Sequence, residues 1–441
     1  MKKKINNLID IIEYKYFEKF SLFLLLFWII SPIIEYLLGN GVEFKRDFYW
    51  VITINAIGLL GILEYCLFIY KEKKDKILNK HNFFPEICLL LLLVLSLISS
   101  IFSKNTLLSF MGESYRKEGL IVYIMYIGIM LSSSIIRDKK YIRVIAQIII
   151  LSAVFITLLP LFKRNFTFIH FSNIYFNTNH YGYFLMISVM LSIFMFIDNK
   201  GIKRVIYGII YFFLLYILIR DDTFGCYLAI TITLLVLFIY VLVRKEKRII
   251  TLMAILVFII TSFFVSHYDI KIGERVNFTN TRGIILKNFK SLFSDTSKII
   301  NKEETTIEEL NSVGSRRGVL WKEAFNYTLE HPLIGGGMEC LGEYYAKCKE
   351  CNNDRPHNVI LQFSSFIGIP GTIIYIVFIV YLALKGLKRL KSDSVKMMIY
   401  FTSMCYFISS MFGNSMYYTS PYFMILLGLL IGINRFKIEN D

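Results

Sequence analysis

Cysteine is scarce in this sequence: seven cysteines among 441 residues are too few for a fold held together by disulfide bonds. Charged residues make up only 19% of the chain while 56% are hydrophobic, which excludes an intrinsically disordered protein. The alternating ten-residue segments of an outer-membrane barrel are also lacking, because the apolar residues come in uninterrupted runs. What remains is a polytopic helical membrane protein.

The uninterrupted apolar runs are each long enough to cross a hydrocarbon core of about 30 Å. They predict an all-α membrane protein with about twelve transmembrane helices. The approximate spans are 18–38, 48–70, 85–103, 119–136, 143–162, 181–198, 204–220, 225–243, 249–267, 369–387, 396–413 and 420–436.

The net charge of +16 could suggest a protein that binds polyanions, so the position of the excess matters. Lysine and arginine are concentrated in alternate short loops, near residues 71–80, 137–143, 200–204, 244–248 and 385–396. Such loops face the cytoplasm, which places both termini there and predicts a multi-pass protein of the cell membrane. The basic excess is therefore a sign of topology, and we expect no nucleic-acid partner.

One hydrophilic segment, residues 268–357, is too long to be a plain connector. It holds thirteen basic and thirteen acidic residues, so the net charge belongs to the rest of the chain. We expect a mostly helical extracytoplasmic domain between spans 9 and 10. The predicted domains are residues 1–267 with spans 1–9, residues 268–357 as the loop domain, and residues 358–441 with spans 10–12.

Ionisable residues inside the spans are few, and Glu64 is the plainest case. Ion-coupled transporters usually place several charges near the membrane midplane, and carriers often have internal repeats or broken helices. This sequence has no convincing repeat of that kind, which argues against a function as a transporter.

Two short polar segments lie on predicted outer loops. Arg116, at an outer boundary where basic residues are disfavoured, could bind a phosphate through its planar guanidinium, or its side chain could simply reach the interface. Asn177 and Asn179 precede span six, where their amides could bind sugar hydroxyls. A helix N-cap is the alternative for this pair.

Two further groups raise the question of a metal. Asp221 and Asp222 follow Arg220 in an outer turn, but two adjacent carboxylates without further ligands predict a capped turn better than a metal site. The loop domain contains three cysteines, for which one disulfide with one thiol left over is possible and zinc lacks a fourth ligand. These are Cys340, Cys348 and Cys351. We expect no metal and no cofactor.

The loop domain also contains a predicted helix that Ser315 can cap and that Pro332 ends. Arg317 lies one turn before Trp321 on the same face, so stacking on the indole is the simple structural interpretation. After the glycine-rich turn at 332–337, the chain returns to the membrane at His357 and Asn358. An imidazole there is well placed as a general base, and a capping histidine is the alternative.

Three motifs together resemble the family of O-antigen ligases and O-antigen polymerases. They are R-x-x-x-W-x-x-A at 317–324, P-x-x-G-x-G at 332–337 and H-N-x-x-L-x(6)-G-x-x-G at 357–371. Each is weak alone, but their order and their place in one long outer loop after nine spans make the resemblance fairly specific over residues 100–390.

The resemblance implies a GT-C-type glycosyltransferase that acts on the outer face of the membrane. Such an enzyme moves a glycan from a polyprenyl-pyrophosphate carrier to an acceptor hydroxyl, with inversion and without a metal or a nucleotide sugar. Its partners would be the lipid-linked donor, a glycan or lipid acceptor, and membrane lipids. His357 matches the proposed base of the family, and Arg317 matches an arginine implicated with the donor pyrophosphate. Asn358, Trp321, Asn177 and Asn179 would support the substrate or the site.

The sequence departs from the family in the turn before span eight. The family usually carries S-R-G there, whereas this chain has Thr223, Phe224 and Gly225, so one arginine is absent. Arg116 or Arg220 could substitute for it in binding pyrophosphate. If neither matters, the mode of donor binding differs from that of the family.

Three activities fit the sequence. A polymerase takes a second lipid-linked repeat as acceptor, and we favour it. A ligase would join the finished glycan to a lipid, a protein or a wall polymer. From another class, a flippase or carrier of lipid-linked oligosaccharides would need a charged central cavity in place of a structured outer domain.

Overall fold

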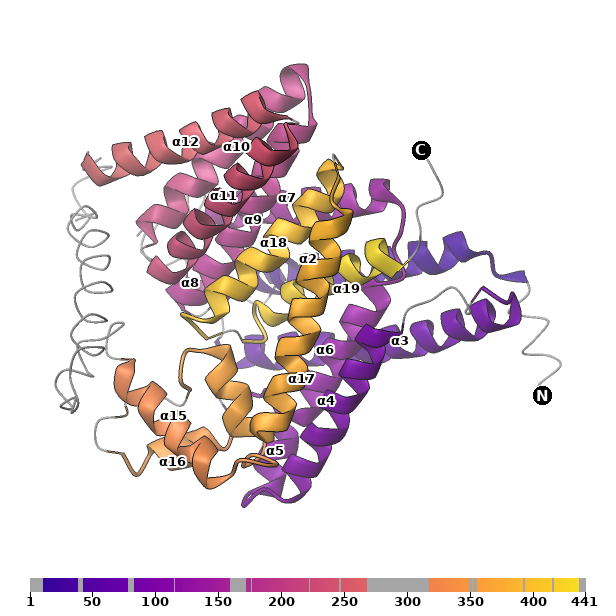
Figure 1. The fold of residues 1–441 in the computed structure, drawn as a ribbon, viewed down its shortest axis with the longest axis vertical. Helices are drawn as coiled ribbons and strands as arrows, with labels where there is room; N and C mark the ends of the chain where they lie inside the picture. Colours follow the sequence, from indigo (N-terminus) through magenta and orange to yellow (C-terminus); the bar gives the residue numbers. More distant parts are fainter. Residues whose placement is uncertain are drawn as a thin grey trace.

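The computed structural model describes residues 11–38, 43–77, 83–114, 116–158, 172–175, 177–221, 223–245, 247–267, 317–348, 351, 355–391, 393–414 and 416–435. These residues form an all-α protein, as the sequence predicts (Figure 1). The helices are α2 (Tyr14–Leu38), α3 (Glu43–Lys74), α4 (Phe84–Ile101), α5 (Thr106–Met111), α6 (Leu120–Ser133), α7 (Lys139–Leu158), α8 (Ser172–Tyr175), α9 (Thr178–Asp198), α10 (Gly201–Arg220), α11 (Phe224–Arg244), α12 (Arg248–His267), α15 (Gly318–Glu330), α16 (Leu341–Tyr345), α17 (Val359–Arg389), α18 (Ser394–Ser410) and α19 (Ser420–Arg435).

Each of the twelve predicted spans coincides with a helix. Among the described residues, nine helices are long and apolar enough to cross a membrane. The spans predicted at 119–136, 396–413 and 420–436 correspond to the shorter helices α6, α18 and α19. The polytopic class is therefore confirmed, and the shorter helices show that the length of an apolar run is not the length of the helix it forms.

Helix α9 is the buried centre of the bundle, and it packs against α10, α18 and α7. Its side chains from 180 to 197 are buried, whereas α4, α10 and α12 expose many large apolar side chains. A helix that is apolar on all sides can be surrounded by protein, while the exposed apolar faces of the outer helices suit contact with lipid.

Helices α3 and α6 approach closely because glycines face each other. A Cβ atom on Gly128 would lie 2.0 Å from the carbonyl oxygen of Gly58, so no side chain fits at this crossing. Nearby, the buried carboxylate of Glu64 accepts hydrogen bonds from Ser21 (2.8 Å) and Ser132 (2.7 Å). The most conspicuous ionisable residue of the spans is thus hydrogen-bonded between α2, α3 and α6.

Helix α17 is interrupted by a kink at Gly368, whose φ is 72°. The residue has a left-handed conformation that glycine adopts without a steric penalty, and Pro370 follows two residues later. The kink separates a first segment, 359–367, from the longer segment that corresponds to the predicted span 369–387. Helix α17 therefore begins ten residues before the predicted span.

The described part of the long hydrophilic loop packs on the membrane helices. Leu320, Ala324 and Tyr327 of α15 share a hydrophobic cluster with Leu120 of α6 and Phe366 of α17. Figure 1 shows α15 and α16 beside the lower half of α17. The division of the chain at residues 268 and 357 remains a prediction, and residues 268–316, with the predicted cap Ser315, lie outside the described residues.

Candidate active site

The turn between α18 and α19, residues 411–414 and 416–419, is contacted by segments that are far apart in the sequence. Arg317, at the start of α15, donates a hydrogen bond to the carbonyl oxygen of Phe412. The side chain of Asn358, at the start of α17, donates to the carbonyl oxygen of Met411 at 3.3 Å. Two predicted site residues therefore bind adjacent carbonyl groups of one turn.

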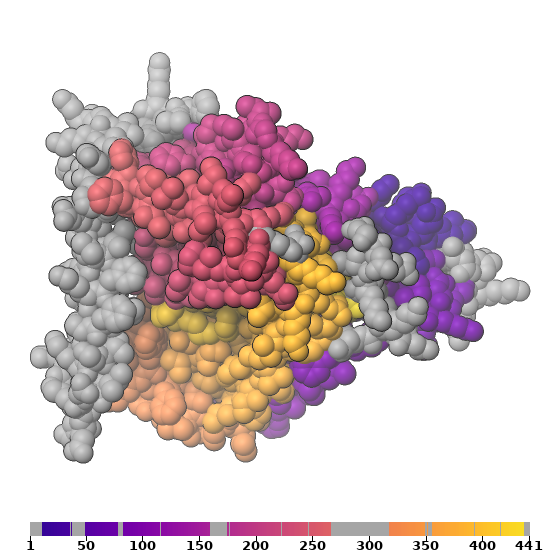
Figure 2. Space-filling model, turned by 45° about the horizontal axis from the view of Figure 1, so that its top comes forward, coloured from indigo at the N-terminus to yellow at the C-terminus, as the bar shows by residue number. Residues whose placement is uncertain are grey.

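Arg116 reaches the same turn from the loop before α6. Its side chain is buried, and its Nη1 lies 3.4 Å from the Sδ atom of Met416. Since Met416 follows Phe412 by four residues, the guanidinium groups of Arg116 and Arg317 approach one short stretch of chain. Figure 2 shows yellow residues of the C-terminal part of the chain between the red residues around 250 and the orange segment that begins at residue 317.

His357 precedes the cap of α17 and is partly exposed. The capping residue is Asn358, whose Oδ1 accepts hydrogen bonds from the backbone N–H groups of Ile360 (3.0 Å) and Leu361 (3.1 Å). The capping role considered for His357 is therefore wrong. His357 has a φ of 55°, which is uncommon outside glycine and concentrates at functional sites.

Trp321 supports the segment that carries His357. Its indole N–H donates a hydrogen bond of 2.7 Å to the carbonyl oxygen of Pro356, the residue before His357. Arg317 donates to the α18–α19 turn, so the interpretation of Trp321 as a stacking partner for Arg317 is wrong. The two named residues of the R-x-x-x-W motif instead donate one hydrogen bond each, Arg317 to the α18–α19 turn and Trp321 to the segment before α17.

We expect Trp321→Phe to lower the rate of glycan transfer about tenfold, because the phenyl ring keeps the packing but cannot donate to Pro356. Loss of one hydrogen bond should reduce the free energy of unfolding by only about 1 kcal/mol. The variant can be tested by transfer assays and by thermal unfolding in detergent. An unchanged rate in a stably folded Trp321→Phe protein would show that this hydrogen bond does not orient the segment of His357 for activity.

The surroundings of the Arg317 guanidinium favour the binding of an anion. Burial lowers the pKa of its guanidinium below the usual value, although the group stays charged at neutral pH. In the part of the chain that the structure describes, no carboxylate forms an ion pair with Arg317, and its hydrogen-bond acceptor is the neutral carbonyl of Phe412. A partly buried cation of this kind gains more from an anionic ligand than a fully exposed one does.

Arg355, which the sequence analysis did not single out, forms a buried ion cluster with two glutamates. Its Nη1 donates to Oε2 of Glu118 at 2.8 Å, and its Nη2 donates to Oε1 of Glu339. The partners are 237 and 16 residues away along the chain, so no spacing in the sequence could reveal the cluster. The sequence offered only one indication of these residues, their closeness to predicted site residues: Glu118 lies two residues after Arg116, and Arg355 lies two residues before His357.

The glycine-rich turn packs against the kink of α17. The backbone N–H groups of Gly336 and Gly337 donate to the carbonyl oxygens of Ser365 (2.9 Å) and Phe366 (3.1 Å). Gly335 has a φ of 70°, and a Cβ atom there would lie 2.4 Å from the carbonyl oxygen of Phe366. The P-x-x-G-x-G motif therefore serves a close contact between two backbones, which explains its glycines without a bound phosphate.

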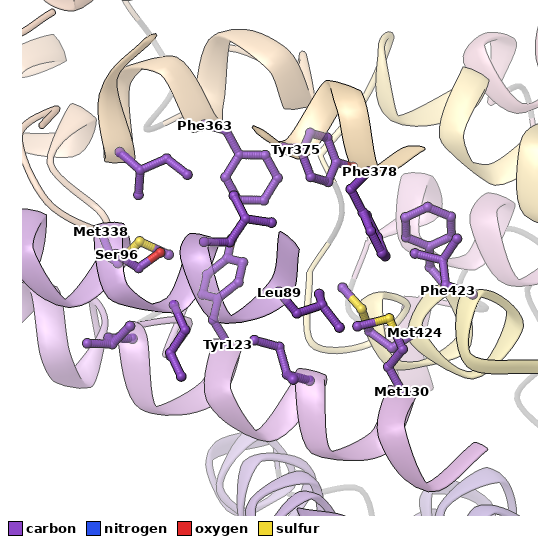
Figure 3. Close-up of a pocket in the computed structure, with 16 residues that line it drawn as sticks. Leu89, Ser96, Tyr123, Met130, Met338, Phe363, Tyr375, Phe378, Phe423 and Met424 are labelled. Atoms are coloured by element: carbon purple, nitrogen blue, oxygen red, sulfur yellow. The ribbon is translucent and has the colours of Figure 1, made fainter. Parts of the chain in front are cut away.

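An apolar cavity of ≈ 80 Å³ lies between α4, α6, α17 and α19. Figure 3 shows Phe363, Tyr375 and Phe378 of α17 facing Leu89 and Tyr123 across this space. The remaining lining is also apolar apart from a serine at one end; it comprises Leu92, Leu93, Ser96, Leu120, Ile127, Met130, Met338, Ile367, Phe423, Met424 and Leu427. The cavity therefore suits a hydrocarbon ligand and not a charged one.

A comparison with protein families agrees with these motifs. Residues 209–376 match the family model described as O-antigen ligase. Over that range the chain is similar to the O-antigen ligase family. The match confirms the family resemblance predicted from the sequence, and the family consists of glycosyltransferase-like membrane enzymes that handle glycans. No curated protein matches the chain.

The O-antigen ligase domain, residues 209–376, contains Arg220 as well as Arg317 and His357. Arg220 ends α10, and its guanidinium lies 5.7 Å from the centre of the Tyr216 ring. The following turn does approach the site, because Gly225 lies against Phe412. The position where the family usually has its arginine thus borders the turn that Arg317 contacts.

Two segments considered for substrate or metal binding have local structural roles. Asn177 caps α9 by accepting a hydrogen bond of 2.8 Å from the backbone of Asn179, so the capping alternative for this pair is confirmed. Asp221 accepts a hydrogen bond of 2.6 Å from the hydroxyl of Thr223, whereas Asp222 lies outside the described residues. Thr223, the N-cap residue of α11, makes no side-chain capping hydrogen bond, so the capped turn stays a prediction.

The cysteine pairing left open by the sequence is resolved. Cys348 and Cys351 form a disulfide, and Cys340 remains a thiol whose Sγ lies 3.4 Å from the carbonyl oxygen of Ser365. The disulfide closes a short loop just before Arg355, in the part of the O-antigen ligase domain that leads to His357.

Proposed function

We propose that this protein transfers a glycan from a polyprenyl-pyrophosphate-linked donor to an acceptor hydroxyl, as a surface polysaccharide polymerase at the outer face of the cytoplasmic membrane. One observation carries the proposal. Arg116, Arg317 and Asn358 all contact the α18–α19 turn, and His357 is adjacent to Asn358. This arrangement supports a single site for the cations that would bind a diphosphate and for an imidazole base.

The proposed roles follow from the chemistry of glycosyl transfer. The acceptor oxygen attacks the anomeric carbon of the donor from the face opposite the diphosphate, which inverts the configuration. His357 takes the proton of the acceptor hydroxyl, and the bond between the anomeric carbon and the diphosphate oxygen breaks. The polyprenyl diphosphate leaves with the bonding electron pair.

Two guanidinium groups support this step. Arg317 has no carboxylate partner among the described residues, so its charge is available for the developing negative charge on the leaving diphosphate. Arg116 approaches from the opposite segment and would bind the second phosphate. We therefore propose a reaction that needs neither a metal nor another cofactor.

The apolar cavity supports a lipid-linked donor. Leu120, at one end of its lining, follows Arg116 by four residues, and Phe363 follows His357 by six. A cavity of ≈ 80 Å³ would hold only a short part of an isoprenoid chain, and a chain end bound there would bring its diphosphate towards the cationic groups. This arrangement favours a lipid-linked donor over a nucleotide sugar.

We expect Ser96→Phe, which narrows the cavity, to raise the KM for a lipid-linked donor about tenfold, equivalent to about 1.4 kcal/mol. The turnover rate at saturating donor should change little, because Ser96 contacts no proposed catalytic group. Leu97→Phe is the matched control, since Leu97 is the next residue of α4 and is exposed. Equal KM values for the two variants would contradict a role of the cavity in donor binding.

The decisive experiment is an analysis of lipid-linked glycans in a strain that lacks the protein. A polymerase defect accumulates single repeats on the carrier, whereas a ligase defect accumulates finished chains. A flippase defect would leave single repeats on the cytoplasmic side of the membrane, where an external glycosidase cannot reach them. Single repeats accessible from outside would support the proposal, and either other result would replace it.

A further inference from the structure

The ion cluster of Arg355, Glu118 and Glu339 is buried almost completely. Arg355 is 0% exposed, Glu118 1% and Glu339 4%. Arg355 bridges the two carboxylates with separate nitrogen atoms of one planar guanidinium, so its fork orients both partners at once.

Glu118 extends the cluster into the membrane helices. Its Oε1 accepts a hydrogen bond of 2.5 Å from the hydroxyl of Tyr126 on α6, and the hydroxyl of Ser420 at the start of α19 donates to the same oxygen at 3.4 Å. The cluster therefore connects the loop before α6, the turn between α15 and α16, the segment before α17 and the start of α19.

Left-handed backbone conformations gather at this cluster. Lys117 has a φ of 51°, Glu339 of 60° and His357 of 55°, and each is a member of the cluster or lies within two residues of one. A side chain with a Cβ atom is strained at such angles, and the strain persists only where the surroundings hold the backbone in place. The other described non-glycine residues with positive φ are Lys76, Lys245, Lys247 and Lys391, all in the lysine-rich loops between other helices.

Stability alone does not account for such a cluster. Buried ion pairs lose much of their favourable energy to desolvation, and well-packed neutral residues of similar volume often serve stability as well. Two carboxylates and one guanidinium, together with three strained residues, are an unfavourable arrangement for the free protein. We therefore attribute the cluster to the backbone geometry that it stabilises around it.

We infer that the buried ion cluster has a positioning role: it fixes the proposed base, His357, and one proposed diphosphate-binding arginine, Arg116, relative to each other. Glu118 lies two residues after Arg116, and Arg355 lies two residues before His357, so one guanidinium joins the two segments. This inference rests on the proposed function. Glu118, Glu339 and Arg355 touch no substrate in it and act only through Arg116 and His357.

The test compares a broken cluster with a neutral one. Arg355→Met alone leaves two carboxylates buried without their cation, and we expect little folded protein. Adding Glu118→Gln and Glu339→Gln removes the uncompensated charges and should restore a folded protein, measured by its yield and melting temperature in detergent. The restored protein should still have a kcat about 10²-fold below wild type, since small displacements of catalytic groups have effects of that size.

The outcomes are distinct. A folded triple variant with low kcat and a KM for the donor within about threefold of wild type supports positioning, because a purely structural role would restore kcat together with folding. A folded triple variant with wild-type kcat overturns the inference. If the triple variant does not fold, Arg355→Lys is measured instead. It keeps the charge but loses the fork, and a wild-type kcat there also overturns the inference.

The proposed function is checked in parallel with His357→Asn. If His357→Asn keeps wild-type transfer, the proposed base is wrong, whatever the cluster does. If His357→Asn abolishes transfer while the triple variant retains it, only the positioning role fails.

Discussion

Replacing His357 with asparagine is expected to lower the rate of glycan transfer by about 10²- to 10⁴-fold, the usual contribution of a general base. Asparagine is chosen because it tolerates the left-handed backbone of this position, where φ is 55°, but it cannot accept a proton at neutral pH. The measurement is the rate of polymer formation from purified lipid-linked repeats, with the amount of folded protein determined separately.

The matched control for the base is His331→Asn. His331 is also a histidine of the long loop, but it follows α15 and its ring lies 4.7 Å from that of Tyr327. Its replacement should leave transfer within about threefold of wild type, because the residue has no part in proton transfer. Normal polymer assembly in His357→Asn would remove the base assignment, and equal losses in both variants would indicate damage to the loop.

Replacing Arg317 with alanine is expected to lower kcat by about 10²- to 10³-fold, the cost of removing one group that stabilises developing negative charge. Binding of the donor should weaken as well, since the ground-state diphosphate is already an anion. The melting temperature should change little, because Arg317 is a partly buried cation with no carboxylate partner among the described residues. The kinetic constants and the melting temperature can be measured on one preparation.

Arg316→Ala is the control for Arg317, since it removes the arginine that directly precedes the motif. Residue 316 lies outside the described residues, and the motif gives it no role, so we expect transfer close to wild type. Arg317→Lys adds a second comparison, because a lysine keeps the charge but loses the planar fork. Equal, mild effects of Arg316→Ala and Arg317→Ala would count against the diphosphate role.

The separate contributions of Arg317 and Arg355 illustrate how structure distinguishes two arginines that look alike in sequence. Arg355 is bound by two carboxylates, which neutralise its charge and leave it as a support. Arg317 donates to a backbone carbonyl and keeps its charge available. Composition and spacing cannot separate these cases, because the partners of Arg355 come from distant segments.

Much of the fold was predictable because the membrane imposes a strong length requirement on apolar segments. All twelve predicted spans coincide with helices, and Asn177 caps a helix as its residue type suggests. The start of α17 was not predictable from hydropathy, since its first segment, 359–367, packs on α15 and includes Gln362, Ser364 and Ser365. There the helix depends on a tertiary contact and not on an apolar run.

The sequence by itself predicted an all-α membrane protein that resembles the O-antigen ligase family, and it indicated His357 and Arg317 as site residues. Hydrophobic runs and short motifs are local properties, so they can be recognised without coordinates. Only the tertiary structure showed that three predicted site residues contact the α18–α19 turn; these are Arg116, Arg317 and Asn358. It also showed that the indole of Trp321 donates a hydrogen bond to Pro356 and that a buried ion cluster joins Glu118 to Arg355. These contacts link residues far apart in the chain, and their energies depend on burial and orientation, which only the folded arrangement of the helices defines.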